Sequence, residues 1–180
     1  MGKSDKGKAG RSKEQEIGQK ISPEEYFLRY AYPCITNLIQ KKTLKREDAD
    51  NLDKILFGQK NVNGISREYL ESCFPEAFRR IKEVAGEMGK DYWDYSVMKK
   101  YWTDAHNSFI DSGDGEYSKA TPSFRELCKV HLAEVVSKKD NVLAVKYDQT
   151  ERNVFATLVP YVKPGDKVSV HLAYAIEKME

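Results

Sequence analysis

The chain has 180 residues, enough for one ordinary domain or two small ones, each with a hydrophobic core. A formal net charge of +2, with 32% charged residues, lacks the strong positive field typical of a dedicated nucleic-acid-binding protein. The longest apolar runs are far shorter than the roughly 20 residues of a membrane span, and the polar N-terminus does not have the pattern of a signal peptide. We therefore expect a cytoplasmic protein that makes no contact with a membrane.

The first 20 residues are polar, and six lysines and arginines stand there against three acidic residues. Ile17 is the only sizeable hydrophobic residue in this segment, so no apolar face is available to anchor it. Residues 1–20 are therefore predicted to form a disordered basic tail. Its small excess of positive charge allows weak attraction to polyanions without specificity.

Residues 21–110 have the periodicity of a small helical bundle. Ser22 is a helix cap, with proline at the first helical position and Glu25 completing a capping box. Apolar residues at helical spacing continue to Ile39, although Pro33 is expected to interrupt the helix. A second helix is predicted from about residue 45 to 57. Two more follow, from Ser66 to about residue 88 with a break before Pro75, and from about residue 94 to 110.

The helical periodicity also predicts whether the cysteines and aromatic residues lie in the core or at the surface. Cys34 and Cys73 fall on apolar stripes and are predicted to lie in the core as reduced thiols. The aromatic residues Trp93, Tyr95 and Trp102 are most simply explained by packing inside the bundle, with a protein-contact patch as the alternative. His106 has no partner at metal-ligand spacing, so we expect it at the surface or as a helix C-cap.

Composition changes abruptly at residues 111–123, which we interpret as a linker. Beyond it, short runs with strand character are predicted near residues 127–136, 141–147, 153–159, 167–171 and 173–178. Pro164, Gly165 and Asp166 fit a type II turn, because proline fixes its own φ and glycine accepts positive φ. Residues 124–180 are therefore expected to form a five-stranded, antiparallel, meander-like small β-barrel of the OB-like kind.

The barrel segment carries a set of short motifs in a particular order. They are Leu127-Cys128, Leu158-Val159, Gly165-Asp166 and Val170-His-Leu-Ala-Tyr-Ala-Ile-Glu177. In this order the segment resembles the HypC/HupF family of nickel-iron hydrogenase assembly chaperones, over residues 127–180 only. The resemblance implies a protein that binds a maturation partner or the hydrogenase large-subunit precursor and handles an iron carrying cyanide and carbon monoxide. It also implies that Cys128 and His171 are the metal or ligand candidates, through a soft thiolate and an imidazole.

Strand alternation makes a separate prediction for these two residues. If Cys128 lies on a strand, it shares its face with Val130, Leu132 and Val136, which predicts a buried thiol. The same alternation turns His171 outward or toward a rim of the barrel.

The overall interpretation is a multidomain α+β protein, with a helical bundle followed by the barrel. No phosphate-binding glycine loop, nucleophile elbow or two-histidine metalloprotease helix occurs in the sequence, so we predict no enzymatic activity. We expect a hydrogenase-maturation chaperone-like protein with a protein partner, without a resident cofactor and with transient contact with iron. The alternatives are a small barrel that binds nucleic acid and a purely structural interaction module.

Overall fold

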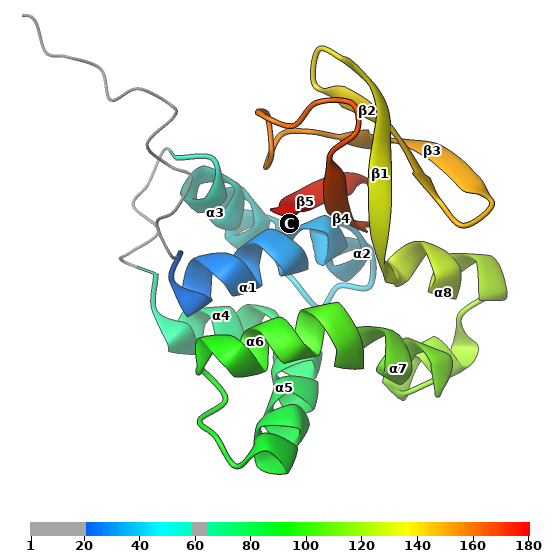
Figure 1. Ribbon diagram of the computed structural model, residues 1–180. Coiled ribbons are helices and arrows are strands. Elements are labelled where there is room, and N and C mark those ends of the chain that lie inside the picture. The colour runs from blue at the N-terminus through cyan, green and yellow to red at the C-terminus, as the bar shows by residue number, and fades with distance from the viewer. Residues whose placement is uncertain (1–20, 59–64) are drawn as a thin grey trace, which may run out of the picture.

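The protein is described from a computed structural model that covers residues 21–58 and 65–180 (Figure 1). The predicted basic tail lies outside these residues. The described part is a mixed helix-and-strand fold, with helices first and five strands at the end of the chain. Within it, no helix combines the length and the apolar character needed to cross a membrane.

The N-terminal helical segment is broken where the sequence predicts. It consists of α1 (Pro23–Ala31), the 3-10 turn η2 (Tyr32–Cys34) and α2 (Ile35–Gln40). The side chain of Ser22 accepts a hydrogen bond from the Glu25 amide at 3.1 Å, which confirms the predicted cap. Pro33 lies in the 3-10 turn, because proline cannot donate the backbone hydrogen bond of a continuous helix.

The remaining helices of the first part form the bundle that was expected. They are α3 (Arg46–Leu56), α4 (Arg67–Cys73), α5 (Pro75–Met88), α6 (Tyr95–Lys100) and α7 (His106–Asp111). The predicted break before Pro75 separates α4 from α5. A π turn, η4 (Tyr101–Ala105), joins α6 to α7 and was not predicted. Such a turn inserts an extra residue into the helix, and here Tyr101, Trp102 and His106 are all buried.

The segment interpreted as a linker contains a 3-10 helix, η5 (Gly115–Lys119), and the start of α8 (Pro122–Cys128). Thr121 caps α8 through a hydrogen bond from the Phe124 amide to its hydroxyl oxygen at 3.3 Å. The first strand therefore begins at residue 130, and the prediction that it begins at residue 127 is wrong. Threonine followed by proline is a helix-start signal, and here it outweighs the strand character of the following residues.

Five strands form a closed ring. They are β1 (Val130–Lys139), β2 (Val142–Tyr147), β3 (Thr150–Phe155), β4 (Lys167–His171) and β5 (Tyr174–Met179), in the spatial order β1-β2-β3-β5-β4. Four neighbouring pairs are antiparallel, whereas β3 meets β5 in parallel through Phe155 and Tyr174. The predicted antiparallel pairing thus holds for four of the five neighbouring pairs, whereas the meander-like order is wrong, because β3 neighbours β5 and β1 pairs with β4.

The interior of the ring is lined by small and β-branched side chains. Its buried cluster contains Ala133, Val135, Leu143, Val145, Val154, Ala156, Val159, Val162, Val168, Val170 and Ala175. On β1 the buried residues are Ala133 and Val135, whereas Leu132 is 57% exposed and Val136 is 45% exposed. The alternation inferred from sequence is thus reversed for β1, and Leu132 and Val136 lie on its outer face.

The turn before β4 has the predicted form. Gly165 has a φ of 90°, and the Asp166 amide donates to the Lys163 carbonyl at 3.1 Å. The Asp166 carboxylate accepts a hydrogen bond from the Lys178 ammonium group at 2.8 Å. Pro164, Gly165 and Asp166 therefore shape the ring, and none of them lines the cavity described below.

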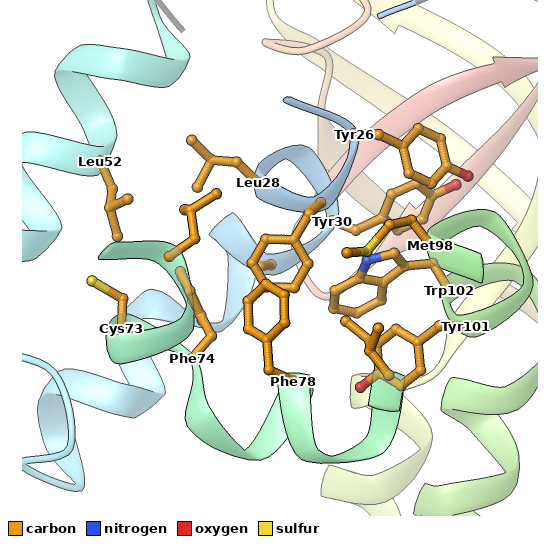
Figure 2. Close-up of a cluster of buried hydrophobic side chains, with 14 of the residues drawn as sticks. Tyr26, Leu28, Tyr30, Leu52, Cys73, Phe74, Phe78, Met98, Tyr101 and Trp102 are labelled. Carbon is orange, nitrogen blue, oxygen red and sulfur yellow. The ribbon is translucent and has the colours of Figure 1, made fainter. Parts of the chain in front are cut away.

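The helices pack directly against the ring. Leu158 and Ile176 from the C-terminal part belong to the same buried cluster as the helical core. The hydroxyl groups of Tyr26 and Tyr30 on α1 donate to Glu177 Oε1 on β5, at 3.1 and 2.6 Å. Figure 2 shows these two hydroxyl groups pointing the same way from their helix. The two parts of the chain thus share a core and a buried polar contact.

Replacing Tyr30 by phenylalanine is expected to lower the free energy of unfolding by about 1–3 kcal/mol, because the Glu177 carboxylate loses a buried hydrogen bond. The Tyr30 hydroxyl also lies 2.9 Å from Ser169 Oγ on β4, so the same change leaves a second polar group without this contact. Urea denaturation of both proteins measures the effect. Tyr161→Phe is the matched control, since Tyr161 is 58% exposed. An equal loss of unfolding free energy in Tyr30→Phe and Tyr161→Phe would contradict a stabilising role for the contact between Tyr30 and Glu177.

Candidate functional site

A cavity of about 170 Å³ lies where the helices meet one end of the ring. Its walls come from α1 and α2, the corner between α4 and α5, the π turn, and the segment from η5 to α8. The lining is mainly apolar and includes the thiols of Cys34, Cys73 and Cys128 together with Trp102 and His106. Concave, mainly apolar sites with a few polar side chains are typical places for small ligands.

Cys128 closes helix α8 and is 4% exposed. Its burial agrees with the sequence prediction, but its place on a helix rather than a strand does not. Burial raises the pKa of the Cys128 thiol to about 11, and the positive charge of Lys41 partly opposes this rise. The thiol is therefore protonated at neutral pH, and a metal ion would have to displace its proton.

His171 ends β4 and points away from the ring interior formed by Val168 and Val170, as alternation predicts, but it is completely buried. The reason is that α1 covers this face of the ring. His171 Nδ1 lies 2.7 Å from the Tyr30 carbonyl oxygen and must donate to it, because a carbonyl only accepts. In the neutral ring Nε2 then carries the lone pair, and it lies 3.8 Å from Cys34 Sγ. Burial lowers the pKa of His171 to about 4, against the opposing effect of backbone hydrogen bonds.

Cys34 is the functional candidate that sequence reasoning missed. It was assigned to the core, but it is half-buried in η2 and lines the cavity. Burial, with Cys128 as the next contribution, raises the pKa of its thiol to about 12. The only local signal was Pro33, which interrupts the apolar stripe just before Cys34. Its contact with His171 joins residues 137 positions apart, which no local pattern predicts.

His106 is 3% exposed, so its predicted surface position is wrong. The π turn before it rotates its ring inward, to 5.1 Å from the ring of His171 and 5.0 Å from that of Trp102. Burial, followed by the neighbouring His171, holds the pKa of His106 well below its usual value. The site therefore contains two neutral imidazoles beside two protonated thiols.

The aromatic residues singled out from the sequence are largely internal. Trp93 is 4% exposed and donates from Nε1 to Glu71 Oε1 at 2.9 Å, and Trp102 is 2% exposed. Tyr95 is half-buried, with its ring 4.9 Å from that of Tyr26. Figure 2 shows Trp102 within the buried cluster. Trp93 and Trp102 therefore belong to the core and cannot form a contact patch at the surface.

The donors at the cavity do not make up a finished metal site. Among residues 21–58 and 65–180, no three histidine, cysteine, aspartate or glutamate side chains are grouped so that they could hold a metal ion. Cys34, Cys128 and His106 line the cavity with soft and borderline donors, and His171 contacts Cys34 without lining the cavity itself.

Comparison with known proteins adds no relative to this picture. No protein-family model matches the chain, and no match was found among curated proteins. The resemblance of the ring to a chaperone family therefore depends on the motif residues alone.

Proposed function

We propose that the protein is a non-enzymatic accessory protein of metal-centre assembly, similar in its C-terminal ring to the HypC/HupF chaperones. In this proposal it binds a protein partner and carries an iron centre as transient cargo. One observation carries the proposal. Cys128 and His171, the two residues matched to the family motifs, lie at the same end of the ring and are joined there by Cys34.

The topology supports the same proposal. A five-stranded ring in which β1 pairs with both β2 and β4 has the arrangement of an OB-like small barrel, which is the fold that the resemblance implies. A fold alone does not determine function, because similar small barrels serve many purposes. The side chains at the cavity are therefore needed to distinguish between them.

The chemistry of the cavity fits a cargo rather than a resident metal. Thiolates are strong ligands for iron and other soft or borderline cations, and His171 Nε2 offers a further lone pair beside Cys34. Lys41 lines the cavity and its charge acts on both Cys34 and Cys128, favouring their deprotonated forms. An iron that brings cyanide and carbon monoxide needs few protein ligands, and the apolar walls keep water away from it.

The outer face of β1 is where we place the partner. Leu132 and Val136 are exposed there, and Leu127 on α8 is 42% exposed. Exposed large apolar residues on one face of a protein are typical of a protein contact. The helical part supplies Cys34 and His106 to the cavity, so it completes the site rather than merely extending the chain.

Nucleic-acid binding is the less favoured alternative. From residue 122 to 180 the chain has nine lysines and arginines against eight acidic residues, which leaves almost no net positive charge for a phosphate-binding surface. A purely structural interaction module is the second alternative, and it would leave the thiols dispensable.

Purification of the protein from its native cells tests the proposal. The expected result is co-purification of a hydrogenase-maturation protein, together with iron that shows cyanide and carbonyl bands in the infrared spectrum. A preparation without iron and without such a partner would refute the proposal. A salt-sensitive complex with nucleic acid would favour the first alternative.

The cysteines provide the matched variants. Cys128→Ser is expected to reduce the bound iron at least about tenfold, because a hydroxyl is a far weaker iron ligand than a thiolate. Cys34→Ser is expected to reduce it less, and Cys73→Ser is the control, since Cys73 lines the same cavity but contacts neither histidine in the described contacts. Iron content by mass spectrometry and partner retention are measured together. An iron content equal to that of the wild-type protein in all three variants would show that the thiols are structural.

A further inference from the structure

Residues 112–121, which we name the strap, run from the end of α7 to the start of α8 and form part of the cavity wall (Figure 1). Glu116 and Tyr117 of the strap line the cavity. None of the ten residues in the strap is buried, whereas the wall on the opposite side is built from core residues of α1 and the π turn. A segment with so little buried surface opens at low cost compared with the core.

The strap is held to α5 mainly through one carboxylate. Asp114 accepts a hydrogen bond from Arg80 Nε at 2.6 Å and another from the guanidinium group of Arg79. Arg80 Nη2 also lies 3.4 Å from the Asp114 carbonyl oxygen. The Arg80 side chain is only 8% exposed, so this ion pair is screened far less than a surface pair.

The chain turns at Asp114, between two glycine residues with positive φ. Gly113 and Gly115 have φ values of 72° and 57°, a region that other residues rarely adopt. A Cβ atom on Gly115 would lie 3.3 Å from Arg80 Nη2, so glycine also permits the close approach to α5. The Arg80 guanidinium in turn lies 5.1 Å from the centre of the Tyr117 ring. Release of Asp114 therefore loosens both the turn and the aromatic residue that covers the cavity.

We propose that the strap is a cover that opens when Asp114 leaves Arg79 and Arg80, and that this opening admits molecules to Cys34 and Cys128. Cys128 belongs to a small buried cluster with Ile110 and Leu172, and Cys34 and Tyr117 pack against that cluster, whereas Cys73 belongs to the main helical core. Figure 2 shows Cys73 next to Leu52 and Phe74, within that core. All three thiols line the cavity, but Tyr117 packs beside Cys34 and Cys128, so opening of the strap should expose these two more than Cys73.

This inference rests on the proposed function only in that it assigns an entrance to the same site. Its test needs neither iron nor a partner protein. The purified protein is treated with a small aromatic disulfide reagent, and the labelling rate of each cysteine is read from its peptide by mass spectrometry. In Asp114→Asn the rates at Cys34 and Cys128 are expected to rise about tenfold, the effect of losing one charge-assisted hydrogen bond on an opening equilibrium. Cys73 lines the same cavity but lies in the main core, so its rate is expected to rise less.

Two further variants support the measurement. Arg79→Gln removes the more exposed half of the ion pair and is expected to give a smaller rise, about threefold. Asp104→Asn removes an exposed pair with Lys100 outside the strap and should change no rate. In Asp114→Asn, amide hydrogens of the strap should also exchange faster, while those of α5 and the ring do not.

Unchanged labelling of Cys34 and Cys128 in both strap variants would overturn the inference. So would an equal rise at Cys73 accompanied by faster amide exchange in α5 and the ring, because that result means unfolding of the whole core rather than opening of the strap. These measurements use the protein without iron or a partner. The opening of the strap can therefore be confirmed even if the iron experiment refutes the proposed function, and it can be refuted even if that experiment supports it.

Discussion

Phe27→Ala is expected to destabilise the protein by about 3–5 kcal/mol, the usual cost of deleting a buried phenylalanine ring. Phe27 is completely buried on α1, and its ring centre lies 4.5 Å from that of Phe78, 5.4 Å from Phe74 and 5.9 Å from Trp102. Deletion of the ring leaves a cavity among side chains that come from α5, the corner before it and the π turn, so neighbouring residues cannot close it without moving these elements.

The same variant tests how many cooperative units the chain contains. Because Leu158 and Ile176 join the helical core, the helices and the ring should unfold together. Guanidinium denaturation followed by circular dichroism and by tryptophan fluorescence should give one coincident transition, shifted to lower denaturant in the variant. Val142→Ala, at a side chain 37% exposed, is the control and should change stability by less than about 0.5 kcal/mol. Two separate transitions, with the ring unaffected by Phe27→Ala, would support independent domains instead.

Stability is expected to fall as the pH drops from about 6.5 to 4. Burial lowers the pKa of His171 from 6.5 to about 4, so the unfolded chain binds a proton in this range that the folded protein does not. The proton favours unfolding, and the stabilisation present above pH 6.5 is lost progressively toward pH 4. For His171 alone the loss is about 3 kcal/mol. The pKa of His106 is lowered in the same direction, which makes the decline steeper.

Urea denaturation at several pH values between 7 and 4 measures this decline. The groups in contact with the two imidazoles are Tyr30, Cys34, Trp102 and Cys128, none of which changes charge in that range. The charges of Arg152 and His131 act on His171, and that of Arg80 acts on His106, as smaller effects. His171→Gln should reduce the slope of stability against pH, whatever its effect on stability at pH 7. His131→Gln removes only one of these smaller effects, leaves both buried imidazoles in place and should retain most of the slope. A wild-type protein with constant stability over this range would contradict the burial of neutral His171.

The elements that the sequence predicted well are those with local causes. Ser22 caps α1, Pro33 and Pro75 divide helices, and Gly165 occupies a turn that requires positive φ. Each of these features depends on a few neighbouring residues, so it can be inferred from a short window of sequence.

The candidate site was predicted only in part, because its causes are not local. Cys128 and His171 were singled out through family motifs, but their surroundings depend on how α1 covers the ring. Strand alternation gave the side of β4 on which His171 lies but not its burial, because a covering helix buries the outer face of β4 as well as the inner one. Cys34 follows the predicted interruption at Pro33, but its contact across the chain was not predictable, and His106 reaches the cavity through a π turn that does not change the apolar spacing enough to be recognised.

The contact of Tyr26 and Tyr30 with Glu177 also bears on the order of events during synthesis. It links residues 151 and 147 positions apart, so the first described helix meets its partner only after the last described strand has left the ribosome. Until then the two tyrosine hydroxyl groups lack their acceptor, whereas the apolar side of α1 already packs against Phe78 and Trp102 of the helical part. Docking of the ring on α1 is therefore a late step, which follows the synthesis of β5.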